Sequence, residues 1–384
     1  MLAMGVLFAT TAAAVSSHQR PPAFLSSPQC CHAASIYHRR TFLSSKPLDV
    51  DIPVDSSRSA EPIESGMDHM PFIAAIQGID LPSSGESFAD AFRVFHGRGG
   101  CFPGSEHLTL DWYPPVLLLT SFREVSNTTL KMYKEELSSW WENTSQVEPL
   151  NLVYQCRSST PTTTQLISGS VPEAHVVTEN GNKFLVHLLR GQNHGLFLDM
   201  SSGRQWVKEH SRDKNVLNLF AYTCAFSVAS LSGGASSVVN VDMSKGALKI
   251  GQRNHELNGL VEAGGVRFLG HNIFKTWGKL KKLGPYQLII IDPPSYQKGS
   301  FVAKNDYIKL VRRLPSLLLP GGSVLLCLNA PELGVEFLRS QVSSAAPELL
   351  FSKRLENPST FPALDPERAL KVLLYQLPEN GPRV

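Results

Sequence analysis

The stretch VLNLFAYTCAFS, Val216–Ser227, is an apolar run that ends in small and hydroxyl side chains just before a helical pattern begins. A second apolar run, Val238–Val241, ends in Asp242, twenty positions after Tyr222. Apolar runs and helical patterns continue to alternate further along the chain, which indicates a parallel sheet with crossover helices. Ligands of such sheets bind outside the carboxyl ends of the strands. The sequence therefore predicts an α/β fold with a ligand site at this turn.

Asp242 indicates which kind of ligand the site would bind. An acid at this spacing can accept hydrogen bonds from both hydroxyls of an adenosine ribose, although a solvated turn aspartate is the alternative. A dinucleotide would also need the glycines of G-x-G-x-x-G to pack its pyrophosphate, and Tyr222–Cys224 contains none. Gly233 and Gly234 come later and are typical of a helix end. The turn therefore favours a nucleoside cofactor without a pyrophosphate.

The third informative stretch is YQLIIIDPPSY, Tyr286–Tyr296, a buried strand that two prolines bring to an end. Proline cannot donate to the sheet ladder, and its ring fixes its own φ. Asp292 precedes a proline and is therefore biased towards an extended backbone. Its carboxylate can accept hydrogen bonds from the edge of a planar base. We expect this segment to face the substrate.

Hydrophobic periodicity places the remaining elements. A helix at 129–141 indicates a small α+β module with two or three strands around it. A strand at 183–189 and a helix at 204–210 precede the main sheet. The expected domains are a small α+β domain, 71–165, and a Rossmann-like domain, 166–384. Strands are expected at 92–95, 108–112, 116–120 and 152–155, then at 216–220, 237–241, 265–269, 288–292 and 323–328, with a closing hairpin at 349–355 and 370–376.

The first 48 residues contain no Asp or Glu but carry four basic residues and many Ser, Thr and Ala. This composition is typical of an organelle transit peptide, for a chloroplast or a mitochondrion, with the chloroplast favoured and a secretory signal as the alternative. Residues 49–70 are polar and are expected to be a linker. The leader holds four of the 36 Lys and Arg residues, which leaves 32 beside 33 acidic ones. Net charge therefore gives no argument for nucleic-acid binding.

Composition also limits two other classes of function. No stretch approaches the roughly 18 consecutive apolar residues of a transmembrane helix, so no membrane partner is expected. The six cysteines show no paired spacing for zinc, so we expect no metal site. Their scatter is typical of a reducing compartment rather than a disulfide framework. The oligomeric state is left open.

Together these motifs resemble class I S-adenosylmethionine-dependent methyltransferases. They are most similar to the bacterial group that modifies large-subunit ribosomal RNA at cytosine carbon 5 or guanine nitrogen 7. The resemblance covers roughly 92–377 and implies a Rossmann-like methyltransferase sheet. Its motifs are NLFAYT at 218–223, VDMS at 241–244, HELNGL at 255–260 and DPPSY at 292–296, with ENG at 179–181, GLFLD at 195–199 and the segment 94–111 upstream.

The resemblance implies S-adenosylmethionine as the cofactor and a base of organellar ribosomal RNA as the substrate. Asp292, Pro293, Pro294, Ser295 and Tyr296 would face the substrate and the methyl group. The residues implied to contact the cofactor are Phe197, Asp199, Asn218, Phe220, Tyr222, Thr223, Asp242, Met243, Asn272 and Asp292.

Several positions depart from the pattern of this group. Cys224 stands where glycine is usual, so the turn cannot use a conformation open only to glycine there. Asn272 replaces an acid, and Ser201 stands where arginine is common. Carbon-5 chemistry needs a thiolate, yet by register Asn329 takes the place of that nucleophile. Cys327 ends an apolar strand, and we expect it to be a buried structural residue.

Basic side chains flank the DPPSY segment and could neutralise phosphates, with aromatic rings nearby for base stacking. A solvated helix face is the alternative. Two other functions also remain open: methylation of a small molecule or a protein, and RNA binding by a non-catalytic assembly factor. The basic residues are Lys275, Lys279, Lys281, Lys282, Lys298, Lys304, Lys309, Arg312 and Arg313, and the rings are Trp277, Tyr296 and Tyr307.

Overall fold

The computed structural model describes residues 70–79, 89–144, 149–158, 161–261, 265–297 and 301–379. The expected leader and the expected linker up to residue 69 lie outside the described residues. Every element described below belongs to one compact unit, Ile63–Val384.

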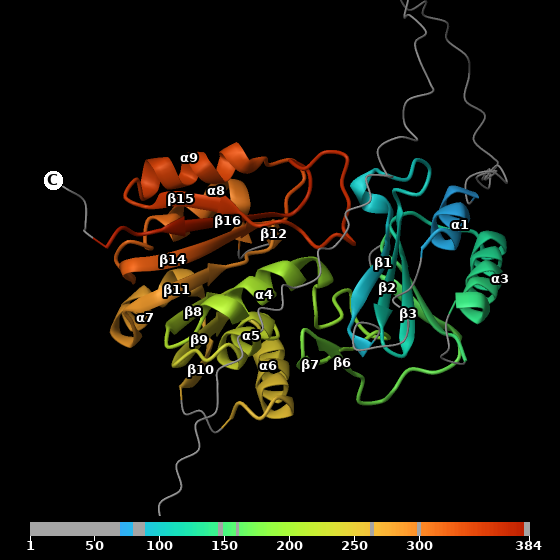
Figure 1. The fold of residues 1–384 in the computed structure, drawn as a ribbon, viewed down its shortest axis with the longest axis horizontal. Helices are drawn as coiled ribbons and strands as arrows, with labels where there is room; N and C mark the ends of the chain where they lie inside the picture. The colour runs from blue at the N-terminus through green and yellow to red at the C-terminus, as the bar shows by residue number, and fades with distance from the viewer. Residues whose placement is uncertain are drawn as a thin grey trace, which may run out of the picture. The chain divides into compact units, whose positions relative to one another are not determined.

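The larger sheet has seven strands in the order β10-β9-β8-β11-β14-β16-β15 (Figure 1). The first five are parallel, whereas β16 and β15 form an antiparallel closing hairpin. This confirms the predicted Rossmann-like α/β class. The strands are β8 Asn215–Leu219, β9 Ser237–Asp242, β10 Val266–Gly270, β11 Tyr286–Ile291, β14 Leu318–Leu328, β15 Leu350–Arg354 and β16 Lys371–Gln376.

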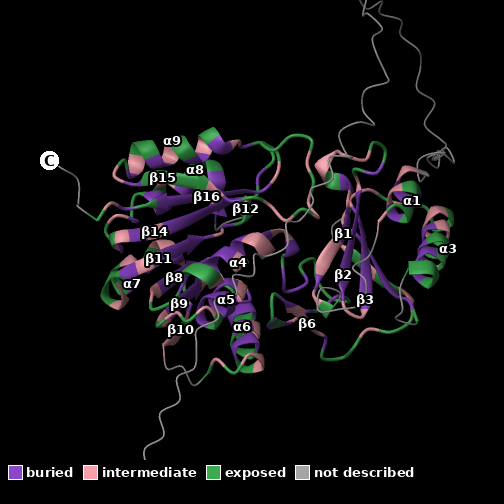
Figure 2. Ribbon diagram, viewed as in Figure 1, coloured by how far each residue is buried: buried purple, intermediate pink, exposed green. Residues whose placement is uncertain are grey.

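Helices cover both faces of this sheet, which is why its central strands, such as β8 and β11, are largely apolar runs. Ile289 and Ile291 of β11 share one core cluster with residues of α7, α8 and α9. Leu288 and Ile290 point to the other face and pack with residues of α4 and α5. Figure 2 shows the central strands β8, β11 and β16 as mostly buried and the helices with buried and exposed residues alternating, whereas the edge strand β15 is largely exposed. The helices are α4 Ser201–His210, α5 Ala225–Ser232, α6 Lys245–Leu257, α7 Trp277–Leu283, α8 Ala303–Val311 and α9 Val335–Ala345.

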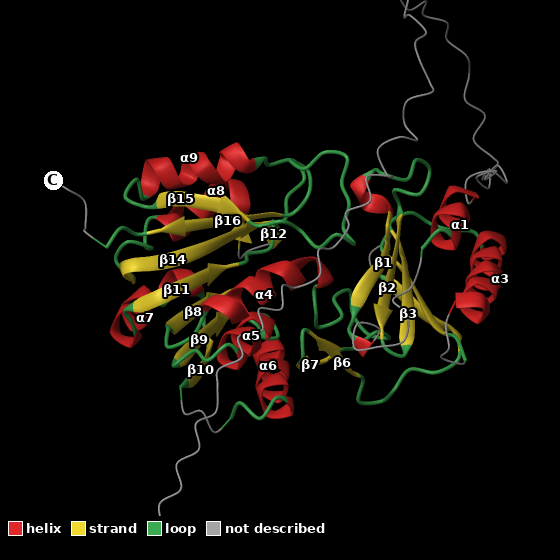
Figure 3. Cartoon of the chain, in the orientation of Figure 1, coloured by secondary structure: helices red, strands yellow, loops and turns green. Residues whose placement is uncertain are grey.

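The smaller sheet has five strands in the order β1-β2-β3-β4-β5, with α1 Met70–Gln77 and α3 Asn127–Thr144 beside it (Figure 3). The expected module of two or three strands around a helix is therefore too small. The strands expected at 92–95, 108–112, 116–120 and 152–155 are present as β1 to β4, and β5 was not expected. The strand without an apolar signal is β5, which carries polar, largely exposed residues and is held by its backbone pairing with β4. The strands are β1 Phe92–His96, β2 Leu108–Tyr113, β3 Val116–Ser121, β4 Asn151–Cys156 and β5 Thr163–Ser168.

A two-stranded hairpin of β6, Val176–Glu179, and β7, Asn182–Leu185, follows the smaller sheet. Its turn residues Asn180 and Gly181 have φ values of 50° and 75°. Two successive left-handed residues are typical of the tight turn that matches the twist of a hairpin. The strand expected at 183–189 therefore exists, but it ends at Leu185.

Candidate functional site

A cavity of about 770 Å³ opens where the parallel strands end. Each of five neighbouring strands is followed by a residue of its wall: Phe220 after β8, Asp242 at the end of β9, Asn272 after β10, Asp292 after β11 and Asn329 after β14. This is the edge at which open α/β sheets bind ligands. The structure brings together all the sequence-predicted site residues except Asn218: Phe197, Asp199, Phe220, Tyr222, Thr223, Asp242, Met243, Asn272, Asp292, Pro293, Pro294, Ser295 and Tyr296.

The turn after β8 has an unusual backbone. Phe220, Tyr222 and Cys224 all have positive φ, at 59°, 47° and 61°. Each left-handed residue other than glycine costs roughly 1–2 kcal/mol, so the surroundings must hold this turn in place. The Asp242 carboxylate does so, because its Oδ2 accepts a hydrogen bond from the Tyr222 N–H at 2.8 Å. Its Oδ1 accepts another from the Ser244 N–H at 2.7 Å.

Cys224 therefore adopts a left-handed backbone conformation, with φ of 61°. Glycine adopts this conformation most easily, but other residues can also adopt it. Its buried side chain packs against helix α6 at Gly251. A Cβ at position 251 would lie 2.5 Å from the Cys224 sulfur and 2.9 Å from its Cβ. Glycine on the helix thus makes room for the cysteine in the turn. Burial raises the pKa of the Cys224 thiol, as expected for a packing residue.

Asn218 does not line the cavity, and the sequence-based interpretation of it as a cofactor contact finds no support in this geometry. Strand residues alternate between faces, and Asn218 points with Val216 into the protein, away from the cavity wall. Its Nδ2 donates to Asn240 Oδ1 at 2.9 Å, and Asn240 Nδ2 donates to Ser227 Oγ at 2.9 Å. Ser227 Oγ lies 2.9 Å from His255 Nε2. This buried chain of hydrogen bonds ties β8, β9, α5 and α6 together beneath the turn.

The wall formed by Asp242 and Asn272 fits the expected nucleoside. Each Asp242 oxygen accepts one backbone N–H, which leaves acceptor capacity for the two ribose hydroxyls. Asn272 Oδ1 accepts from the Phe274 N–H at 2.9 Å. Among the described residues the Asn272 amide nitrogen has no acceptor, so it can donate to a ring nitrogen of adenine. The rings of Phe197 and Tyr222 lie 5.4 Å apart on the same wall.

Asp292 is half-buried in the cavity wall, and the pKa of its carboxyl group is shifted from the usual value. Burial and the neighbouring Asp199 raise its pKa to about 7, against the opposing charge of Arg204. Arg204, which also lines the cavity, donates to both Glu179 oxygens at 2.6 Å and to the Phe197 carbonyl at 2.7 Å. Asp292 can therefore change between its neutral and ionised forms near neutral pH.

Asn329 lines the cavity where a carbon-5 enzyme would need its thiol. Its Nδ2 donates to Asp199 Oδ2 at 3.3 Å. Cys327 lies two residues earlier in β14, is 0% exposed and packs in the core with α4 and α5. Burial raises the pKa of its thiol well above the usual value. The prediction that Cys327 is a buried structural residue is confirmed, and no cysteine is among the described residues that line the cavity.

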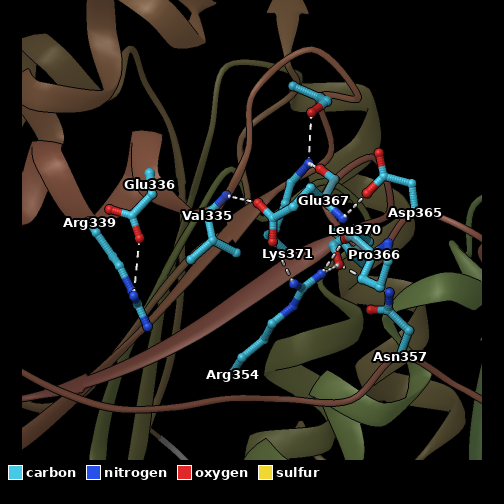
Figure 4. A network of polar contacts seen from close by, with 11 residues as sticks. Val335, Glu336, Arg339, Arg354, Asn357, Asp365, Pro366, Glu367, Leu370 and Lys371 are labelled. Carbon is cyan, nitrogen blue, oxygen red and sulfur yellow. Dashed lines mark hydrogen bonds and ion pairs between the residues drawn. The ribbon is translucent and has the colours of Figure 1, made fainter.

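The segment after Asn329 is held by a buried lysine (Figure 4). Lys371 Nζ donates to the Ala330 carbonyl at 2.8 Å and to the Glu367 carbonyl at 2.9 Å. The Glu367 carboxylate accepts from the Val335 N–H at 2.6 Å and from Arg354 at 3.3 Å. Burial, with a contribution from Arg354, lowers the pKa of Lys371 to about 8. This network fixes the backbone beside the cavity wall.

The basic rim predicted around DPPSY is only partly supported. Tyr307 is fully buried and its hydroxyl donates to the Cys327 carbonyl at 2.9 Å, so its proposed role in base stacking is wrong. Tyr296 lines the cavity and is 65% exposed. Lys309 is paired with Asp306 at 2.7 Å, and Lys298 lies outside the described residues. The described basic residues of this rim are exposed, but none of them lines the cavity.

Arg98 and Arg204 are cavity residues that the sequence did not reveal as such. Arg98 comes from η2, Gly97–Gly99, which had the appearance of an ordinary glycine-rich turn. The one signal for Arg204 was Glu179 in the ENG motif, because a buried acid needs a basic partner. Within the described part of the chain, no cluster of His, Cys, Asp or Glu could hold a metal ion. The helices described there include none that is long and apolar enough to span a membrane.

Comparison with known proteins agrees with this geometry. The profile of the S-adenosylmethionine-dependent methyltransferases matches residues 92–376. Ribosomal RNA large subunit methyltransferase I of Aeromonas salmonicida (strain A449) is 31% identical over 239 residues, which are 61% of this chain and 59% of that protein. Ribosomal RNA large subunit methyltransferase K/L of Shewanella loihica is 40% identical over 159 residues, which are 40% of this chain and 22% of that protein.

The chain thus spans less than two thirds of the length of each of these curated relatives. Among solved structures, SMU.776, described as a methyltransferase complexed with SAH, is similar with a TM-score of 0.65 and 25% identity. That similarity covers 75% of this chain and 76% of the other. The fold, the cavity and the matched profile lead to one conclusion: the chain belongs to the S-adenosylmethionine-dependent methyltransferase family.

Proposed function

We propose that this protein methylates a nitrogen atom of a base in ribosomal RNA. The proposal rests on one observation: Asp292 and Tyr296 lie on the same short segment, and both line the cavity. A carboxylate there can accept an N–H from the edge of a base, while the exposed ring of Tyr296 offers a stacking surface for its face. Relatives that are named as ribosomal RNA methyltransferases support RNA as the substrate class.

Three residues of the cavity wall, Asp242, Asn272 and Asp292, would have separate roles in this reaction. Asp242 and Asn272 would hold the ribose and adenine of S-adenosylmethionine, which supplies an electrophilic methyl group. Asp292 would orient the base nitrogen through its N–H. The proton lost from that nitrogen as it gains the methyl group would pass to a carboxylate oxygen of Asp292. A pKa of about 7 suits such proton transfer, because the base form is available near neutral pH.

Nitrogen is favoured over cytosine carbon 5 by the side chains at hand. Carbon-5 methylation needs a thiolate that adds covalently to the base. Among the described residues, the cavity wall contains no cysteine, and the amide of Asn329 cannot act as that nucleophile. Cys327 is buried in the core and stays protonated.

The test is methyl transfer from isotopically labelled S-adenosylmethionine to unmodified large-subunit ribosomal RNA. The RNA is then digested, and the labelled nucleoside is identified by mass spectrometry. A nitrogen-methylated nucleoside that disappears with Asp292→Ala supports the proposal. A carbon-5 product, or transfer only to small molecules or proteins, contradicts it. Cofactor binding without turnover on any RNA would instead favour a non-catalytic assembly factor.

We also propose that residues 1–48 direct the protein to the chloroplast. The support is their composition, which lacks acidic residues and is rich in Ser, Thr and Ala. Fusion of residues 1–48 to a fluorescent protein tests this in plant cells. Fluorescence in mitochondria or in the secretory pathway would contradict the proposal.

A further inference from the structure

One part of the cavity wall consists of residues to which the proposed function gives no role. Arg98 of η2 lines the cavity together with Gln192 and Asn193. Its guanidinium carbon lies 3.9 Å from the centre of the Phe122 ring. The guanidinium carbon of Arg157 lies 5.8 Å from the same ring. Two cations are therefore gathered on one aromatic ring, and one of them, Arg98, lines the cavity.

These two arginines have no direct ion pair within the described part of the chain, although the charge of Asp111 acts favourably on Arg157. Among the described residues, neither Arg98 nor Arg157 lies within salt-bridge distance of a carboxylate, whereas nearby Arg93 is paired with Asp111 at 2.7 Å. Arg98 has no hydrogen-bond acceptor among the described residues. Burial and the charge of Arg93 lower the pKa of Arg98. A bound anion would relieve this repulsion.

Some N–H groups of Arg157 bind other residues of the protein, whereas one NH2 group has no partner among the described residues. Its Nε donates to Gln155 Oε1 at 2.5 Å, and its Nη2 donates to the Gln192 carbonyl and, at 3.5 Å, to His194. Nη1 has no acceptor among the described residues. Arg157 thus braces the segment of Gln192 that lines the cavity and keeps one donor group for a ligand.

The backbone that presents Arg98 is held on both sides. A Cβ on Gly97 would lie 1.8 Å from the Ser105 carbonyl oxygen, and one on Gly99 would lie 1.7 Å from the Pro362 carbonyl oxygen. The Gly99 carbonyl also accepts from the Leu364 N–H at 2.9 Å. Such close backbone approaches fix the position of η2. The guanidinium of Arg98 is therefore presented by a rigid support, which favours specific binding.

We propose that Arg98 and Arg157, stacked on Phe122, form a site for a backbone phosphate of the RNA whose base enters the cavity. This inference rests on the proposed function. Guanidinium groups match the geometry of phosphate oxygens, and phosphate contacts set the register of a bound nucleic acid. The site assigns a substrate contact to the smaller α+β domain, which carries both arginines and the ring.

The test compares Arg98→Gln with Arg339→Gln. Arg339 lies on α9, 4.7 Å from the Phe351 ring, and it does not line the cavity, so this control removes the same charge from a similar ring contact. The affinity for a fluorescent 20-nucleotide single-stranded RNA of mixed sequence is measured over a range of salt concentrations. S-adenosylmethionine affinity, thermal unfolding and turnover on ribosomal RNA are measured in parallel.

We expect Arg98→Gln to weaken RNA binding about tenfold, because a charge-assisted contact is lost. The slope of log affinity against log salt should fall by about 0.7, the value for one phosphate of a single strand. Arg98→Lys should keep the slope and recover part of the affinity, since the charge remains but the fork of donors does not. Arg339→Gln should bind RNA within about twofold of the wild type, and cofactor affinity should not change in any variant.

Three outcomes would overturn the inference, and they are distinguishable. If the wild type binds and methylates RNA but Arg98→Gln keeps its affinity and salt slope, the phosphate site is absent and the proposed function stands. If Arg98→Gln loses cofactor affinity instead, Arg98 holds the cofactor. If the wild type neither binds nor methylates RNA, the proposed function fails and the phosphate site fails with it.

Discussion

The two walls of the cavity are built differently. The wall for the nucleoside comes from the ends of β8, β9 and β10. Its turn is supported by the hydrogen-bonded, partly exposed Asp242 and by the buried, hydrogen-bonded Asn218 and His255. The wall that we propose faces the substrate carries Tyr296, which is largely exposed, and Arg98, which has no carboxylate partner among the described residues. A cofactor of one fixed shape suits a rigid support. The large polymeric substrate that we propose would suit exposed rings and unpaired charges at the opening.

Asp292, at the boundary between the walls, should show the largest effect. Asp292→Asn should lower turnover about 1000-fold, because a positioned proton acceptor contributes roughly 10²–10⁴ in rate. In the wild type, kcat/KM should rise with pH up to about 7 and then level off, because the carboxyl is protonated below its raised pKa of about 7. Rate measurements from pH 5.5 to 9 check both statements.

The matched control is Asp306→Asn, because Asp306 lies on α8 and does not line the cavity. Its turnover and pH profile should follow those of the wild type. Equal losses in the two variants would show that Asp292 has no special part in the reaction.

Asp242→Ala tests the rigid wall. The substitution removes the acceptor for two backbone N–H groups and for the ribose hydroxyls, so cofactor affinity should fall at least about 100-fold. Isothermal titration calorimetry measures the affinity. An unchanged affinity would show that Asp242 does not bind the cofactor. The proposed difference between the two walls would then be wrong.

Gly251→Ala tests the support behind that wall. The new Cβ would meet Cys224, and the variant should lose about 2 kcal/mol in the free energy of unfolding, as overpacked cores do. Gly246→Ala on the same helix is the control, because its nearest contact would be Ser244 Oγ at 3.9 Å. Urea denaturation measures both. Equal stability of the two variants would mean that the turn can move away from α6.

Tyr296→Ala should show the smallest effect and tests the exposed wall. Loss of one stacking surface should raise the KM for RNA about tenfold, whereas Tyr296→Phe should stay close to the wild type. Phe351→Ala, at an exposed ring on β15, should leave the KM unchanged. A drop in kcat with no change in KM would place Tyr296 in the reaction itself rather than in RNA binding.

Much of the larger sheet could be predicted because its strands are buried on both faces. Burial on both sides produces the continuous apolar runs that mark β8, β9 and β11 in the sequence. Strand β5 escaped prediction for the opposite reason. It lies at the edge of the smaller sheet, has no fully buried residue and is held by backbone hydrogen bonds, which depend little on the side chains.

The candidate site divides in the same way. Spacing along the chain determined that Tyr222, Asp242 and Asp292 meet at one edge, because the carboxyl ends of parallel strands lie together. Only the tertiary structure decided which neighbouring side chains enter the cavity. Asn218 points into the protein and Tyr307 into the core, because each has a partner far away in the sequence.

The sequence by itself therefore determined the class of fold, the residues at the nucleoside side of the cavity and the Asp292 carboxylate that we propose faces the substrate. These features depend on local patterns and on the order of strands in the chain. Tertiary packing alone brought Arg98 and Arg204 to the cavity wall, from a turn and a helix that the sequence did not mark as parts of the site. The physical reason is that a charged side chain takes its position from its surroundings, and those surroundings come from distant parts of the chain.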